Sequence, residues 1–289
     1  MPQRLKAEAL LVLTTMIWGA TFVVVKDALA HATPLAFLGV RFTLAGILLF
    51  IFLNKGWPRA AALGRGILLG IFLFGGYLFQ TTGLQYTTPS KCAFITGFAV
   101  ILVPFIQMMF GLRLRTATVL GAALGLLGIY LLVMPSGLAA VNRGDLLTLL
   151  GACAFAVHIV LVGAYTKRYS FRQLVSIQIL TVGLLALLAW PMGLPFKLHW
   201  SLGLVAVIVV TAVLATGVAF SVQNWAQQFT PPAHTALIFA LEPVFAAVTS
   251  WVVLHERLGG RLFLGAALIL AGMVISELWG GSTPSPVEG

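Results

Sequence analysis

The chain has 289 residues, of which 60% are hydrophobic and 8% are charged, and its mean hydropathy is +1.05. A soluble domain carries about three times that charged fraction, so the composition excludes a water-soluble globule and predicts an integral membrane protein. The net charge of +10 does not indicate a nucleic-acid partner, because the Lys and Arg residues cluster between apolar segments without interleaved aromatic residues.

Ten apolar segments are long enough to cross a bilayer, which takes roughly 20 residues of helix. In chain order they are residues 8–26, 34–53, 63–83, 91–111, 116–134, 145–165, 172–190, 201–223, 233–254 and 261–279. The breaks between them are short and carry turn or charge signals, which makes sequential helices antiparallel neighbours. We predict an all-α, polytopic membrane protein with ten transmembrane helices and a disordered Pro/Ser-rich tail, residues 281–289.

Aromatic and polar side chains mark the first three spans. Trp18 and Phe22 lie in the first span, and Arg41 lies early in the second. In the third, helical spacing puts three side chains on one face: Tyr77, Gln80 and Thr81. These residues, Arg41 excepted, are predicted to line a substrate cavity. For Arg41, binding of a substrate carboxylate and a structural role at the helix end are both open, and the structural role is favoured.

The fourth, fifth and tenth spans carry signals for helix geometry. Pro104 is a candidate hinge in the fourth span. Gly121 and Gly125 form a GxxxG pair, and Ala267 and Ala271 form a pair of the same spacing in the tenth span. Small residues at this spacing let helix backbones approach closely, so these pairs predict either an internal scaffold or a homodimer face.

Ionisable and amide groups lie at membrane depth in the sixth, eighth and ninth spans. His158 is mid-way through the sixth, Gln223 and Asn224 end the eighth, and Glu242 is followed by the candidate hinge Pro243 in the ninth. Such groups usually face the bundle interior or a wet cavity. We therefore predict all four polar residues as cavity-lining, and Glu242 and His158 as candidates for proton coupling. The alternatives are a carboxyl group that locks a kinked helix and a hydrogen-bonded interior histidine.

The two halves of the chain repeat. "LGAALGLLGIYLL" from Leu120 and "LGAALILAGMVIS" from Leu264 match at an offset of 144 residues. Residues 1–135 and 144–280 are thus predicted to be two five-helix repeats, and the odd helix number makes them inverted. Inverted repeats commonly enclose a site near mid-membrane, so we expect a central cavity. Ten Lys and Arg residues lie on the side of the membrane that holds the N-terminus, and six lie on the opposite side. This bias favours both termini in the cytoplasm.

These motifs resemble a known family. "MIWGATFVVVK", "LEPVFAAVTSWVVLHERL" and "LGAALILAGMVIS" are similar to the EamA-type, ten-helix members of the drug/metabolite transporter superfamily, with one EamA-like unit per half. The resemblance implies a multi-pass carrier of the bacterial inner membrane, usually an exporter, and is greatest to YddG-like exporters of amino acids, aromatic ones among them. The first unit departs from the pattern, because Leu112 stands where the second has Glu256 and Pro104 is out of register with Pro243.

The predicted function is a secondary active or facilitative transporter that exports small amphipathic metabolites, above all amino acids, by alternating access. Its partners are the solute and the lipid bilayer. No enzyme activity, cofactor or metal is expected, because no GxxxxGK[ST] or HExxH motif and no Cys/His cluster occurs. The alternatives are an exchanger of phosphorylated or nucleotide-linked solutes, which needs cations such as Arg41 or Lys91, a multidrug cation exporter, a membrane-embedded lipid enzyme and a scaffold subunit.

Overall fold

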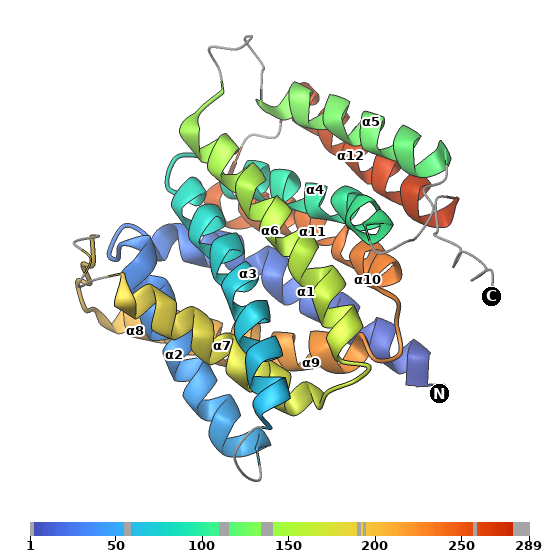
Figure 1. Ribbon diagram of the computed structural model, residues 1–289. Helices are drawn as coiled ribbons and strands as arrows, with labels where there is room; N and C mark the ends of the chain where they lie inside the picture. The colour runs from blue at the N-terminus through green and yellow to red at the C-terminus, as the bar shows by residue number, and fades with distance from the viewer. Residues whose placement is uncertain are drawn as a thin grey trace, which may run out of the picture.

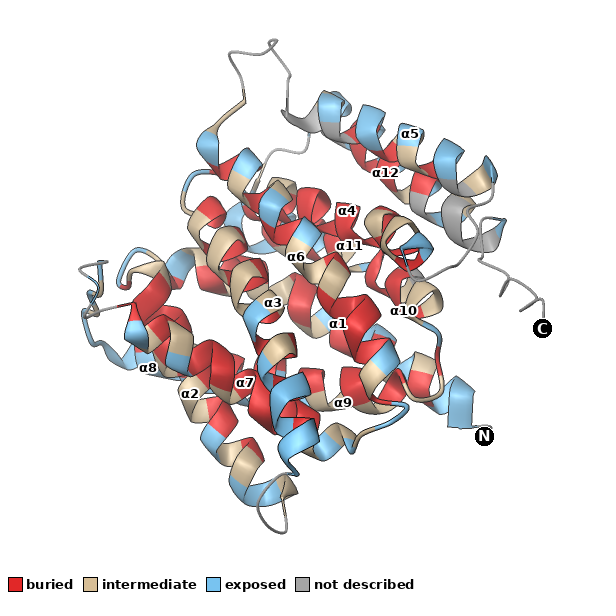
Figure 2. Cartoon of the chain, viewed as in Figure 1, coloured by how far each residue is buried: buried red, intermediate tan, exposed pale blue. Residues whose placement is uncertain are grey.

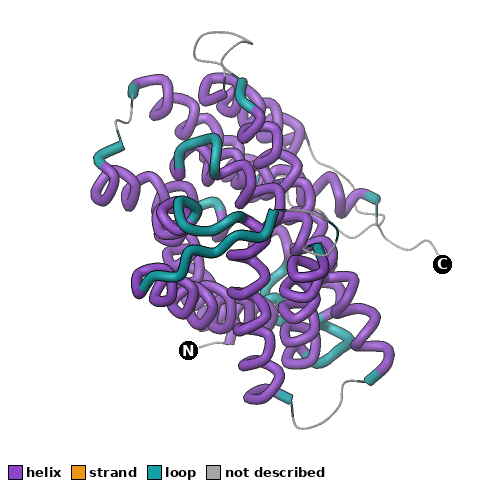
Figure 3. The backbone as a smooth tube through the Cα atoms, turned by 90° about the vertical axis from the view of Figure 1, so that its left-hand side faces the viewer, coloured by secondary structure: helices purple, strands orange, loops and turns teal. Residues whose placement is uncertain are grey.

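The computed structural model describes residues 3–54, 59–109, 116–133, 141–189, 192, 195–256 and 259–279. Within these ranges the chain is helical and has no strand, as Figure 3 shows, apart from one isolated bridge between Ala32 and Leu198 in two loops. The all-α prediction is confirmed for this part of the chain. The predicted tail 281–289 and Leu112 lie outside it.

The helices follow one another with short connections. In chain order they are α1 (Gln3–Ala28), α2 (Pro34–Leu53), α3 (Ala60–Leu84), α4 (Pro89–Met108), α5 (Thr116–Val133), α6 (Arg143–Tyr165), α7 (Phe171–Leu188), α8 (Leu202–Val210), the π-helix η2 (Thr211–Val218), α9 (Ala219–Ala226), α10 (Pro232–Phe239), α11 (Glu242–Leu254) and α12 (Gly260–Leu278). Side chains cap several of the starts, because the first N–H groups of a helix lack internal partners. Thr88 caps α4, Asn142 forms a capping box with Asp145 on α6, and Ser201 caps α8.

Seven helical segments among the described residues are long and apolar enough to cross a membrane: Gln3–Ala28, Pro34–Leu53, Ala60–Leu84, Pro89–Met108, Arg143–Tyr165, Phe171–Leu188 and Leu202–Ala226. The last of these contains α8, η2 and α9 in one uninterrupted run. Shorter apolar helices cover Val119–Gly128, Glu242–Leu254 and Phe263–Gly272. This set of helices is that of a multi-pass membrane protein.

The molecule is apolar outside and partly polar inside. Large hydrophobic side chains such as Ile51, Leu126 and Val209 are exposed, and Figure 2 shows α5 with much of its surface exposed. Polar side chains are buried in the interior, among them Gln178 and Asn224. Hydrocarbon is the solvent for such a surface, and polar groups find partners only within the bundle.

The predicted span 233–254 is not one continuous helix. It is interrupted at Ala240–Leu241, and α11 starts at Glu242. The physical reason is Pro243, which has no N–H to donate to the carbonyl of Phe239, four residues earlier. Pro104, in contrast, lies inside α4, which continues to Met108. The part that either proline plays as a hinge stays a prediction.

The glycine stripe of α5 is used within the chain. Figure 1 shows α5 and α12 side by side at the edge of the bundle, and their backbones touch. A Cβ placed on Gly128 would lie 2.6 Å from the carbonyl oxygen of Gly265, and one on Gly272 would lie 3.0 Å from the amide nitrogen of Gly125. Ala267 and Ala271 are exposed instead. The GxxxG pair therefore belongs to an internal scaffold, and the alanine pair is not part of it.

Candidate functional site

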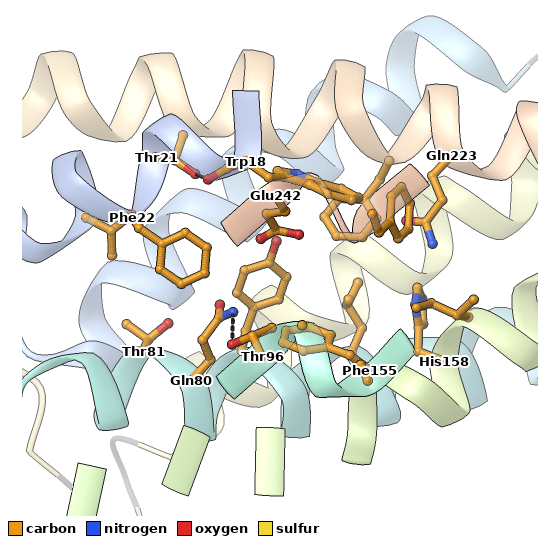
Figure 4. Close-up of a pocket in the computed structure, with 18 of the residues that line it drawn as sticks. Trp18, Thr21, Phe22, Gln80, Thr81, Thr96, Phe155, His158, Gln223 and Glu242 are labelled. Atoms are coloured by element: carbon orange, nitrogen blue, oxygen red, sulfur yellow. Dashed lines mark hydrogen bonds between the residues drawn. The ribbon is translucent and has the colours of Figure 1, made fainter. Parts of the chain in front are cut away.

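A cavity lies inside the bundle, between α1, α2, α3, α4, α6, α9 and the break that separates α10 from α11 (Figure 4). The empty space between its walls, with the open volume at its mouth, is about 830 Å³. The residues that line it include Trp18, Phe22, Arg41, Tyr77, Gln80, Thr81, Thr96, Phe155, His158, Phe220, Gln223, Phe239 and Glu242.

The structure brings together eight of the nine residues predicted from the sequence as cavity-lining. They come from five helices: Trp18, Phe22, Tyr77, Gln80, Thr81, His158, Gln223 and Glu242. Asn224 is the exception, because its fully buried side chain points into the protein and bonds to Gln178 and to the backbone. Arg41 lines the cavity as well and is buried, so of the two forms that a structural role could take, snorkelling outward and bracing a helix, the structure leaves only the second.

Aromatic rings form much of the cavity wall. The Trp18 ring centroid is 5.1 Å from those of both Phe220 and Phe239, and Tyr77 is 5.3 Å from Phe155. These tilted and edge-on arrangements are the favoured ones for ring pairs. Phe155, Phe220 and Phe239 were not predicted, because a single Phe in an apolar span carries no signal that separates a cavity face from a packing face.

Glu242 reaches the cavity because α1 and α11 pack tightly together. A Cβ on Gly19 would lie 2.7 Å from the Glu242 carbonyl oxygen and 2.9 Å from the Ala246 nitrogen, so only glycine fits there. This contact places Glu242 beside Trp18, and Figure 4 shows its carboxyl group directed into the cavity. Among the described residues, no cation forms an ion pair with it. The carboxyl group is free to meet a solute or a proton.

Amide and hydroxyl groups occupy the same cavity. Gln80 Nε2 donates to Thr96 Oγ1 over 3.1 Å, the bond drawn in Figure 4. Gln223 Nε2 donates to Gln227 Oε1 over 3.2 Å, and Gln227 Nε2 donates to the Ile159 carbonyl over 3.1 Å. The predicted Gln80 and Gln223 thus face inward with protein partners, as polar groups at membrane depth require.

His158 is held in one tautomer by a chain of hydrogen bonds. The Phe220 carbonyl accepts from Asn224 Nδ2, so Asn224 Oδ1 is the acceptor for Gln178 Nε2, at 3.0 Å. Gln178 Oε1 then faces His158 Nε2 at 2.6 Å and accepts from it. Neutral imidazole has one N–H, so His158 carries it on Nε2 and leaves Nδ1 as an acceptor. The sequence could not reveal Gln178 or its bonds to His158 and Asn224, because these bonds depend on α6, α7 and α9 meeting.

We expect Gln178→Leu to destabilise the protein. The change leaves His158 Nε2 and Asn224 Oδ1 without partners in an apolar interior, at a cost of about 1–3 kcal/mol. The measurement is the melting temperature of the purified protein in detergent. Gln173→Leu, on the partly exposed face of the same helix, is the matched control. Equal behaviour of the two variants would contradict the hydrogen-bonded chain.

Arg41 is anchored to the π-helical segment η2. Its Nε donates to Thr216 Oγ1 over 2.9 Å, and its Cζ lies 5.1 Å and 5.4 Å from the ring centroids of Phe42 and Tyr77. Thr216 Oγ1 in turn donates to the Thr211 carbonyl over 3.0 Å. A second contact of η2 holds Trp18, whose Nε1 donates to the Ala215 carbonyl over 2.8 Å. π-Helical turns are rare and concentrate at functional sites.

An all-helical membrane protein with an internal cavity, aromatic walls and inward-facing polar groups is built to hold a small molecule at membrane depth. The sequence matches the EamA-like transporter family over residues 5–134 and again over residues 142–278, and the chain belongs to this family.

Similar proteins extend over nearly the whole chain. An uncharacterized transporter of Archaeoglobus fulgidus is 36% identical over 277 residues, which is 96% of this chain and 87% of the relative. A probable amino-acid metabolite efflux pump of Escherichia coli (strain K12) is 26% identical over 295 residues, 94% of each chain. One solved crystal structure has the same fold, with a TM-score of 0.70, 20% identity, and 95% of this chain and 98% of that chain covered. The membership of a transporter family predicted from the sequence motifs is confirmed.

Proposed function

We propose that this protein is a secondary active or facilitative transporter that exports small amphipathic metabolites, above all amino acids, by alternating access. The observation that carries the proposal is the cavity itself, in which aromatic walls surround a basic side chain, Arg41, and an acidic one, Glu242. An apolar wall suits an organic side chain, and the charged groups suit the ends of a polar backbone. The name of the Escherichia coli relative, a probable amino-acid metabolite efflux pump, points to the same class of solute.

Alternating access needs two halves that move against each other, and the helix contacts support such halves. We take residues 1–135 and 144–280 as two inverted five-helix repeats, with α8–η2–α9 and α10–α11 each serving as one span of ten. A two-fold relation of this kind pairs α2 with α7 and α5 with α12, and both pairs are in contact. The same relation exchanges α1 with α6, so the contact of α3 with α6 should have a counterpart between α9 and α1. Likewise, the contact of α4 with α6 should have a counterpart between α11 and α1. All four contacts occur.

The alternatives from the sequence fit the cavity less well. An exchanger of phosphorylated solutes needs several cations at its site, but Lys91 is paired with Asp145 over 2.8 Å and does not line the cavity. A cation exporter would use Glu242 and would have to tolerate Arg41 in the same space. We place the protein in the bacterial inner membrane, as the family resemblance implies, and place both termini in the cytoplasm on the basis of the Lys and Arg distribution. A homodimer stays a prediction.

Proton coupling, where present, is assigned to Glu242, with His158 as the second candidate. The other titratable groups that line the cavity are Arg41 and Tyr77. Glu242 ranks first because no ion pair holds it in the described structure, whereas His158 Nε2 is engaged by Gln178.

Counterflow in vesicles tests the proposed function. The purified protein is reconstituted with unlabelled solute inside, and entry of labelled solute is followed without any gradient of protons. We expect exchange of phenylalanine and other amino acids. Exchange confined to cationic drugs, or to phosphorylated sugars, would replace the proposal by one of the alternatives. Protein-free vesicles and vesicles with heat-inactivated protein serve as controls.

A further inference from the structure

We infer that Arg41 binds the carboxylate of the transported solute and that Thr216 positions it, so the site selects zwitterions over amines of the same shape. This inference rests on the proposed function and assigns the two ends of the solute to named residues. Arg41 is 3% exposed, lines the cavity, and has no carboxylate partner among the described residues.

A buried guanidinium without a partner charge is unusual. Charged side chains are almost never buried unless they are paired, because the loss of hydration has to be offset. Arg stays protonated in proteins, so it cannot become neutral to avoid this cost. The groups around Arg41 offset it in part, through the rings of Phe42 and Tyr77 and the hydroxyl group of Thr216. None of them carries a negative charge at neutral pH, and a bound carboxylate would supply the missing one.

The hydrogen bond from Arg41 to Thr216 occupies only Nε, and the Tyr77 hydroxyl group is a second polar neighbour of the guanidinium. Nε is the atom that donates to Thr216, and the terminal nitrogens form the fork that grips carboxylates in a bidentate manner. Thr216 is fixed in turn by its bond to the Thr211 carbonyl inside η2. The π-helical segment therefore sets the direction of the guanidinium.

The second charge in the cavity defines the other end of the solute. Glu242 lines the same space and does not pair with Arg41. A cation would neutralise only Glu242 and would feel repulsion from Arg41, and an anion would do the reverse. A zwitterion satisfies both, with its ammonium group toward Glu242 and its side chain against the aromatic wall around Trp18 and Phe220.

Competition in the counterflow assay tests the inference on the wild-type protein. Labelled phenylalanine competes with each of three unlabelled analogues. 2-Phenylethylamine lacks the carboxylate, and phenylalanine amide has a neutral amide group in its place. The third analogue, 3-phenylpropionate, keeps the carboxylate and lacks the amine. We expect each analogue to compete at least about 100-fold less well than phenylalanine, because a site built for a polar group rejects ligands without it. Equal competition by phenylethylamine and the amide overturns the role of Arg41 while the proposed function stands. Absence of any amino-acid exchange overturns both.

Variants separate binding from packing. We expect Arg41→Lys, which keeps the charge but loses the fork, to reduce the preference for phenylalanine over phenylethylamine at least about tenfold. Thr216→Val, which removes the hydroxyl group at nearly constant volume, should reduce the same preference, and Thr216→Ser should restore it. A ratio measured within one variant is insensitive to the amount of folded protein. An unchanged ratio in both Arg41→Lys and Thr216→Val contradicts the inference.

Discussion

Replacing Glu242 by Gln should abolish the effect of a pH gradient on transport and leave the protein folded. Glutamine keeps the size of the side chain but neither ionises nor takes up a proton. Glu242 faces the cavity and forms no ion pair within the described structure, so its loss removes no internal salt bridge. The same variant should also slow exchange of phenylalanine itself by about tenfold or more, since one charge-assisted bond to the ammonium group is lost.

The decisive quantity is the ratio of uptake with a pH gradient to uptake without one. We expect this ratio to fall to about one in Glu242→Gln, whatever the residual rate. Glu8→Gln is the matched control, because Glu8 pairs with Arg4 and His234 and lies outside the cavity. A ratio that stays at its wild-type value in Glu242→Gln but falls in His158→Gln would move the coupling role to His158. A ratio of one in the wild type would identify a facilitative transporter.

Replacing Gly128 by Leu should disrupt the packing of α5 on α12 and strongly destabilise the protein. The first atom of any side chain at this position would lie 2.6 Å from the Gly265 carbonyl oxygen and 3.0 Å from the Ile269 nitrogen. Both are backbone atoms of α12, which cannot move aside as a side chain can. Overpacking of this kind typically costs about 1–3 kcal/mol and occasionally more, a large part of the stability of a folded protein.

The melting temperature in detergent and the elution profile in gel filtration report this effect. Gly64→Leu provides the control, since a Cβ at Gly64 in α3 would meet no atom within 4 Å. We expect the control to behave as wild type and Gly128→Leu to melt earlier or to aggregate. Wild-type stability of Gly128→Leu would mean that α5 and α12 do not approach as closely as described here.

The sequence by itself determined the class of protein and most of the cavity. So few charges among so many apolar residues leave only a membrane protein, because the hydropathy of a chain decides its solvent. Polar residues at membrane depth, such as Gln80, His158 and Glu242, had to face inward, because hydrocarbon offers them no partner. The repeated glycine pattern and the family motifs could also be read directly, since they are local in the chain.

The tertiary structure decided which partners these residues have. For Arg41 the sequence leaves a structural role and binding of a substrate carboxylate both open, and only the arrangement of α2 against η2 brings it to the cavity. The π-helical turn that holds it, the links from His158 through Gln178 to Asn224, and the use of the GxxxG pair against α12 join residues far apart in the chain. Whether a side chain is buried depends on that residue and its solvent, and the local sequence encodes this preference. A hydrogen bond or a close helix contact needs two surfaces, and only the complete fold determines which surfaces meet.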